Sequence, residues 1–148
     1  MTYTERLRPP FLWWVVFGLV GVTFVIAVAV FFDTWFVLAT LGVVLAIEVV
    51  TMLAFTGSVE VTEKGVAAGR ALLEWPYVGT VTVLSKDEVR IRMGRDADPR
   101  AFLAYRSYVE EAVEIAVSDE ADPHPYWLVS TRDAAALAAA IEKARVAA

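Results

Sequence analysis

Two long apolar runs near the start of the chain constrain its fold more than any other feature. Residues 11–32 contain no charged side chain, and residues 35–55 contain only one, Glu48. At about 1.5 Å per residue, each run is long enough to cross the roughly 30 Å hydrocarbon core of a membrane as a helix. Only Asp33 and Thr34 separate the runs. We therefore expect a transmembrane hairpin with antiparallel spans at about residues 11–32 and 35–55.

The rest of the composition supports a membrane protein and excludes several functions. The first run is longer than the ~7–15 apolar residues of a signal peptide, and a second run follows at once. Hydrophobic residues make up 58% of the chain, its net charge is −5, and it has no cysteine and one histidine, His124. The acidic balance argues against nucleic-acid binding. The missing cysteines exclude disulfides and thiolate metal sites. We expect no cofactor and no bound metal.

The basic residues beside the runs predict the orientation. Arg6 and Arg8 precede the first run, Lys64 and Arg70 follow the second, and the turn between the runs holds only Asp33. The positive-inside rule then places both termini in the cytoplasm. We expect a multi-pass protein of the inner (plasma) membrane, with residues 1–56 as the hairpin and residues 57–148 as a cytoplasmic β domain.

Short alternating runs replace continuous apolarity after residue 56, as is typical of half-buried strands. We expect about seven strands, at residues 58–62, 66–69, 71–75, 77–84, 101–106, 112–118 and 126–131. Asp133 would cap an alanine-rich C-terminal helix. The predicted class is an α+β membrane protein, whose small, mostly antiparallel β domain is pleckstrin-homology-like and ends in a helix. This comparison of folds is an analogy and carries no function.

Residues 85–93 fit two structures. Val89, Ile91 and Met93 alternate with polar residues as in a strand. Ser85 and Glu88, however, have the spacing of a capping box, which marks the start of a helix. We favour a short helix.

Glu48 is the most unusual residue, because an ionisable side chain within a span is costly and commonly functional. Folding the hairpin at Asp33 places Glu48 level with a segment flanked by Gly18 and Gly21, where the helices can approach closely. Glu48 could relay a proton or cation, or contact a partner span. Alternatively, it is a protonated acid, or it reaches toward the nearer interface.

Other candidates lie in the β domain. Tyr126, Trp127 and Arg132 could form a surface that recognises a partner protein, or the two aromatic rings could fill the core. Four arginines could meet anionic headgroups or could form a solvated mixed-charge face with neighbouring acids: Arg90, Arg92, Arg95 and Arg100. The acids Glu110, Glu111 and Glu114 lack the spacing of a calcium loop and indicate a surface face.

Several stretches resemble a family of actinobacterial membrane proteins catalogued as domain of unknown function 3093. They are residues 3–7 (YTERL), Pro10 with Trp13-Trp14, residues 98–102 (DPRAF) and residues 122–132 (DPHPYWLVSTR). The resemblance covers nearly the whole chain, and the last stretch is its most specific part. It implies an actinobacterial inner-membrane protein and assigns no activity.

These observations lead to two functional hypotheses. In the first, a non-enzymatic accessory module presents its β domain at the cytoplasmic face and binds a membrane-protein partner or reinforces a larger membrane complex. Without such a partner, we expect a homo-oligomer. In the second, an oligomeric transporter or channel subunit uses Glu48, because two spans are too few to enclose a path. An enzyme is disfavoured, since no paired acid–base groups or nucleophile motif occurs.

Overall fold

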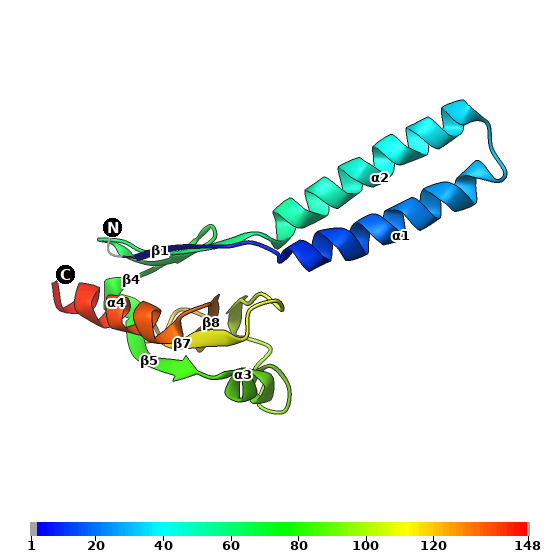
Figure 1. The fold of residues 1–148 in the computed structure, drawn as a ribbon. Coiled ribbons are helices and arrows are strands. Elements are labelled where there is room, and N and C mark those ends of the chain that lie inside the picture. The colour runs from blue at the N-terminus through cyan, green and yellow to red at the C-terminus, as the bar shows by residue number, and fades with distance from the viewer. Residues whose placement is uncertain (1–2, 148) are drawn as a thin grey trace. The chain divides into compact units, whose positions relative to one another are not determined.

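The structure is a computed structural model that describes residues 3–147, and it divides into two compact units. One unit runs from Arg8 to Thr56. It contains helix α1 (Phe11–Ala29) and helix α2 (Thr34–Phe55), joined by a short turn (Figure 1). The other unit combines the residues up to Leu7 with those from Gly57 onward. The two-helix arrangement expected for residues 11–55 is confirmed.

Helix α1 is apolar on every side, and α2 is interrupted by a single charged residue, Glu48. The 19 residues of α1 and the 22 of α2 are long and apolar enough to cross a membrane, by length and composition. At about 1.5 Å per residue they measure roughly 28 and 33 Å. No residue of α1 is buried within the described structure. A helix that is apolar all round requires apolar surroundings.

The β unit begins with a four-stranded antiparallel sheet in the order β1-β2-β3-β4. Its strands are β1 (Tyr3–Leu7), β2 (Gly57–Val61), β3 (Gly65–Ala68) and β4 (Ala71–Glu74). The pairing of β1 with β2 runs from Tyr3 opposite Val61 to Leu7 opposite Gly57. Residues 1–10 were expected to belong to the hairpin segment, so this strand was not predicted. The β unit therefore includes chain from both sides of the hairpin.

The second sheet has the order β5-β7-β8-β6 and is mixed. It contains β5 (Val78–Leu84), β6 (Phe102–Ala104), β7 (Glu111–Val117) and β8 (Tyr126–Thr131), and the short 3-10 helix η1 (Trp75–Tyr77) leads into it. β6 lies parallel to β8, whereas the other pairs are antiparallel. The expected α+β class with mostly antiparallel strands is confirmed, and the parallel edge strand was not anticipated.

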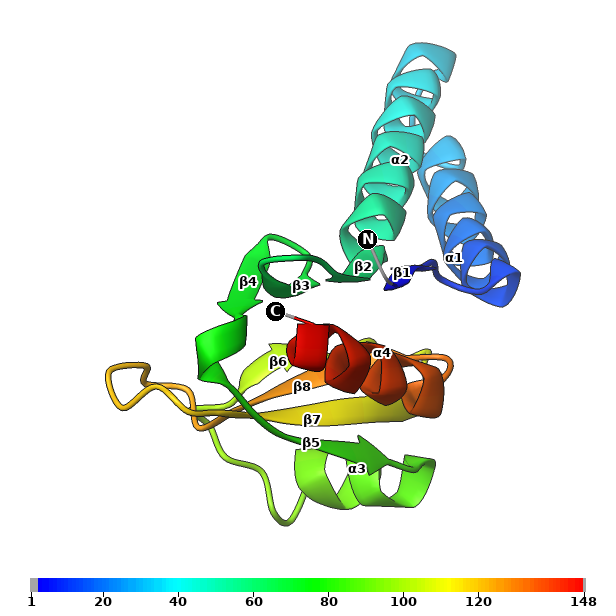
Figure 2. The same ribbon diagram turned by 90° about the vertical axis from the view of Figure 1, so that its left-hand side faces the viewer.

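Two helices cover opposite faces of the second sheet (Figure 2). Helix α3 (Lys86–Met93) packs Val89 against one face, and its N-terminus has the capping box expected from Ser85 and Glu88. Helix α4 (Ala134–Ala147) buries Leu137 and Ile141 against the other face, within the main core. Those two positions are one turn apart and so share a helix face. Residues 85–93 are thus a helix, as favoured from the sequence.

The N-terminus of α4 is capped as expected. The Ala136 N–H donates to Asp133 Oδ1 at 2.8 Å. Such a bond satisfies one of the backbone donors that the first helical turn leaves without a partner. This cap places the start of α4 directly after β8, so the end of β8 and the beginning of α4 form one corner of the β unit.

Candidate functional site

Glu48 faces the neighbouring helix of the hairpin at a glycine. Its Oε1 atom lies 3.5 Å from the position that a Cβ atom on Gly18 would occupy. One turn of α1 further on, a Cβ on Gly21 would come within 2.7 Å of Val44 Cγ1, closer than side chains approach. The two glycines therefore lie in the seam between α1 and α2, as the sequence predicted. At Gly21 the two helices lie so close together that a methyl group would not fit.

Tyr126 and Trp127 belong to the interior of the β unit. Their exposed fractions are 7% and 5%. The ring of Trp127 packs on Phe102 with centroids 4.3 Å apart, and its buried Nε1 has no hydrogen-bond partner among the described residues. Of the three residues considered as a recognition surface, only Arg132 is exposed. The two aromatic side chains fill the core, which was the alternative interpretation of this strand.

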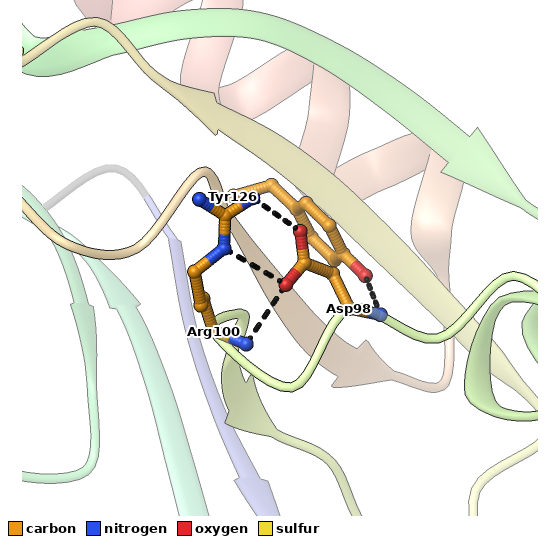
Figure 3. Close-up of polar contacts among 3 residues, drawn as sticks. All are labelled: Asp98, Arg100 and Tyr126. Atoms are coloured by element: carbon orange, nitrogen blue, oxygen red, sulfur yellow. Dashed lines mark hydrogen bonds and ion pairs between the residues drawn. The ribbon is translucent and has the colours of Figure 1, made fainter.

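Tyr126 also holds the loop between α3 and β6 in place (Figure 3). Its hydroxyl accepts the N–H of Asp98 at 3.4 Å. The carboxylate of Asp98 accepts the backbone N–H of Arg100 at 2.9 Å and pairs with its guanidinium at 3.0 Å. The hydrogen bond from the Arg100 side chain holds the pKa of Asp98 below its usual range. This cluster fastens the loop to β8.

Arg92 adds two further contacts to this cluster. Arg92 makes a two-pronged hydrogen bond with Glu114 and lies over the Tyr126 ring, 4.5 Å from its centroid. The hydrogen bond to Glu114 raises the pKa of Arg92. Such paired and stacked geometry suits the planar guanidinium of arginine. Helix α3 is thereby tied to strand β7 as well as to β8.

The arginine patch considered from the sequence is therefore largely neutralised. Arg92 is paired with Glu114, Arg95 with Asp96 at 3.1 Å, and Arg100 with Asp98. This arrangement favours the mixed-charge face over a surface for anionic headgroups.

His124 is held by its neighbour in the turn before β8. Its Nδ1 lies 2.7 Å from Asp122 Oδ1, which also accepts the His124 backbone N–H at 2.8 Å. These bonds hold the pKa of Asp122 below its usual range. The His124 ring meets the edge of Phe102 at 5.9 Å between centroids. The contacts rigidify the turn.

A polar network joins the two sheets at one end of the β unit. Glu5 Oε2 accepts hydrogen bonds from Thr131 Oγ1 at 2.6 Å and from the Tyr3 hydroxyl at 3.0 Å. Glu5 Oε1 accepts the backbone N–H of Arg132 at 3.1 Å. Thr131 is fully buried. Sequence reasoning missed this network because its partners are 126 residues apart.

Arg106 and Tyr108 lie at the same end. The Tyr108 hydroxyl donates to the carbonyl of Leu7 at 3.1 Å. The Arg106 guanidinium lies over Gly57, with its Nε only 3.0 Å from the position of a Cβ on that glycine. Burial raises the pKa of Tyr108, and the charges of Arg106 and Arg132 oppose this rise. Both guanidinium groups are thus close to one phenol at the Leu7–Gly57 end of the first sheet.

A groove of about 490 Å³ lies between α3 and residues 105–110, and its lining includes the ion pair of Lys86 and Glu110 at 2.6 Å. Within residues 3–147, no group of three or more histidine, aspartate or glutamate side chains is arranged to hold a metal ion.

Comparisons with known proteins agree with the resemblance described above. No curated protein and no solved structure matches this chain. The model of the family described as protein of unknown function (DUF3093) matches residues 2–141, which is nearly the whole chain, so the protein belongs to that family.

Proposed function

We propose that this protein is a membrane-anchored, non-enzymatic interaction module. Its hairpin spans the plasma membrane and holds the β unit at the cytoplasmic face, where it serves as an accessory subunit for a membrane-protein partner. One observation carries the proposal. The β unit has its own packed core of aliphatic side chains, whereas the separate α1–α2 unit exposes apolar side chains along its whole length.

The energetics favour a membrane over water as the surroundings of the hairpin. Leu12, Val20 and Phe24 are more than half exposed, as are many other apolar side chains of α1 and α2. At about 25 cal/mol per Å² of apolar surface, each apolar side chain that moves from water into the membrane contributes roughly 1.5–3 kcal/mol to the free energy of transfer. Soluble proteins rarely leave so extended an apolar surface uncovered. The arginines that flank the hairpin support cytoplasmic termini.

The architecture of the β unit supports a pleckstrin-homology-like fold. A four-stranded antiparallel sheet is followed by a second sheet, and the chain ends in a helix that contributes Leu137 and Ile141 to the main core. Helix α3 and the parallel strand β6 are additions to that pattern. The likeness is an analogy of fold and carries no function by itself.

The absence of cysteine from the chain allows a clean topology experiment. Single cysteines replace Asp33 in the turn and, separately, Ser107 in the β unit. A membrane-impermeant maleimide should label position 33 in intact cells and position 107 only after permeabilisation. Extraction of the whole protein by alkaline carbonate would refute the membrane anchor. Labelling of position 107 in intact cells would refute the cytoplasmic β unit.

The accessory role is tested by purifying the tagged full-length protein in mild detergent and identifying bound proteins by mass spectrometry. We expect a stoichiometric membrane-protein partner. A homo-oligomer without a partner would contradict the accessory role and would favour the transporter hypothesis.

The position of Glu48 against Gly18 supports that second candidate function, an oligomeric transporter or channel subunit. The carboxyl lies within the helix seam, where it can bind a proton or cation shared between copies. Proteoliposomes that contain the Glu48→Gln variant should then lose an ion flux that the wild type supports. The matched control is Asp33→Asn, which makes the same carboxyl-to-amide change in the turn. Equal fluxes in wild type and Glu48→Gln would exclude this role.

A further inference from the structure

The groove between α3 and residues 105–110 follows one face of that helix along its whole length. Five residues with the i, i+3, i+4, i+7 and i+8 spacing of a single helix face line it: Lys86, Val89, Arg90, Met93 and Gly94. The eight residues of α3 measure roughly 12 Å at about 1.5 Å per residue. Since an extended chain advances about 3.3 Å per residue, roughly four residues of such a chain span this length. We call this feature the α3 groove.

The other side of the α3 groove is the connection between β6 and β7. It contributes Tyr105, Ser107, Val109 and Glu110 to the lining. Val89 and Val109 are 3% and 4% exposed, so they form an apolar floor. The hydroxyls of Tyr105 and Ser107 make no hydrogen bond within the part of the chain that the structure describes. Both hydroxyls can therefore donate to, or accept from, the peptide groups of a bound chain.

The charged residues that line the α3 groove leave one cation without a partner. They are two cations and one acid, Lys86, Arg90 and Glu110, so the lining carries one net positive charge. Glu110 pairs with Lys86 at 2.6 Å. Within residues 3–147 no acid, including Asp87 one turn before it, forms an ion pair with Arg90, whereas the other three arginines of this region each pair with a carboxylate. A guanidinium beside an apolar floor is complementary to a carboxylate that is flanked by apolar side chains.

We propose that the α3 groove binds a short extended segment of the partner protein, in which an acidic side chain stands between apolar ones. The proposal rests on the accessory role proposed above. The acidic side chain of the segment pairs with Arg90, and its apolar side chains cover Val89 and Val109. The hydroxyls of Tyr105 and Ser107 bond with its backbone. A groove that follows the length of a helix suits an extended chain better than a compact ligand.

The test uses full-length protein in mild detergent and two peptide probes that differ only in charge. The probes are acetyl-Leu-Glu-Leu-Ala-amide and its uncharged control, acetyl-Leu-Gln-Leu-Ala-amide. Labelling the methionine methyl groups with carbon-13 provides the nuclear magnetic resonance signal, because Met93 lines the groove and Met52 on α2 serves as the internal reference. The acidic peptide should shift the Met93 signal saturably. It should bind about fivefold more tightly than the uncharged peptide, as expected for an exposed ion pair.

Three variants, all at exposed positions, separate the contributions of charge and space. Arg90→Gln should weaken binding of the acidic peptide about fivefold and should remove the preference between the two peptides. The matched control is Arg95→Gln, which removes the same charge from the turn after α3, outside the groove lining. It should retain both the affinity and the preference of the wild type. Ser107→Trp places a large ring in the groove and should abolish the saturable shift with either peptide.

Three results would overturn the proposal while leaving the accessory role intact. They are a Met93 signal that neither peptide shifts, equal affinity of the wild type for the two peptides, and a preference for the acidic peptide that survives in Arg90→Gln. The same holds if a membrane-protein partner co-purifies equally with the wild type, Arg90→Gln and Ser107→Trp, because the partner then binds elsewhere. Absence of any partner from the wild-type purification would instead contradict the accessory role itself, whatever the peptides do.

Discussion

The substitution Thr131→Val tests whether the Glu5 network holds the two sheets of the β unit together. Valine has nearly the same shape as threonine, so the change removes the hydroxyl and leaves the packing of a fully buried site in place. The lost bond joins Thr131 Oγ1 to the Glu5 carboxylate at 2.6 Å. A hydrogen bond to a charged group contributes about 1.5–3 kcal/mol. We expect the free energy of unfolding of the β unit to fall by that amount.

The expected change is large enough to measure by thermal unfolding. For a domain of roughly 60–100 residues, 1 kcal/mol shifts the midpoint by about 4–8 °C, so the variant should melt roughly 6–24 °C below wild type. With the other four tryptophans replaced by phenylalanine, fluorescence of the buried Trp127 reports on the β unit in full-length protein in detergent. Thr4→Val is the control, since Thr4 is exposed on β1 and should change the midpoint little. A Thr131→Val midpoint within about 2 °C of wild type would refute the reasoning, because it corresponds to less than about 0.5 kcal/mol.

Three further predictions test the seam, the core and the loop cluster. Gly21→Ala should weaken the packing of α1 on α2, because its Cβ would lie 2.7 Å from Val44, whereas Gly18→Ala should be tolerated; resistance of the hairpin to unfolding by sodium dodecyl sulfate measures both. Leu137→Ala should lower the stability of the β unit by about 2–5 kcal/mol in the same melting experiment, since the side chain is fully buried. Arg100 lowers the pKa of Asp98, so the ion pair stabilises the fold at pH values above the ordinary aspartate pKa. This stabilisation is lost as the pH falls through the lowered pKa. Asp98→Asn should therefore flatten the dependence of the melting midpoint on pH between about 5 and 2.

Features encoded within a few neighbouring residues could be predicted from the sequence. The hairpin follows from two apolar runs that are interrupted only at Asp33 and Thr34. Helix α3 follows from the capping box of Ser85 and Glu88, which outweighed the strand-like alternation that follows it. The apolar runs are continuous in sequence, and the capping box joins residues three positions apart, so a local pattern records both features directly.

Features that depend on distant partners could not be predicted in the same way. Tyr3–Leu7 is a strand because Gly57–Val61 pairs with it across the whole hairpin. Two prolines follow this strand, and no turn sequence connects it directly to the strand with which it pairs. The Glu5–Thr131 bond and the position of Arg106 over Gly57 likewise join residues that no local pattern relates. Both contacts are visible only once the strands are paired.

Strand β1 changes how the connection between the β unit and the hairpin should be understood. If the β unit began at Gly57, one linker would attach it to the hairpin, and the domain could rotate about that linker. Instead, the hairpin is inserted between β1 and β2, two strands that pair with each other over five residues. Both ends of the hairpin thus enter the same hydrogen-bonded ladder, with three residues on one side and one residue on the other. These two connections therefore restrict the rotation of the β unit more than a single linker would.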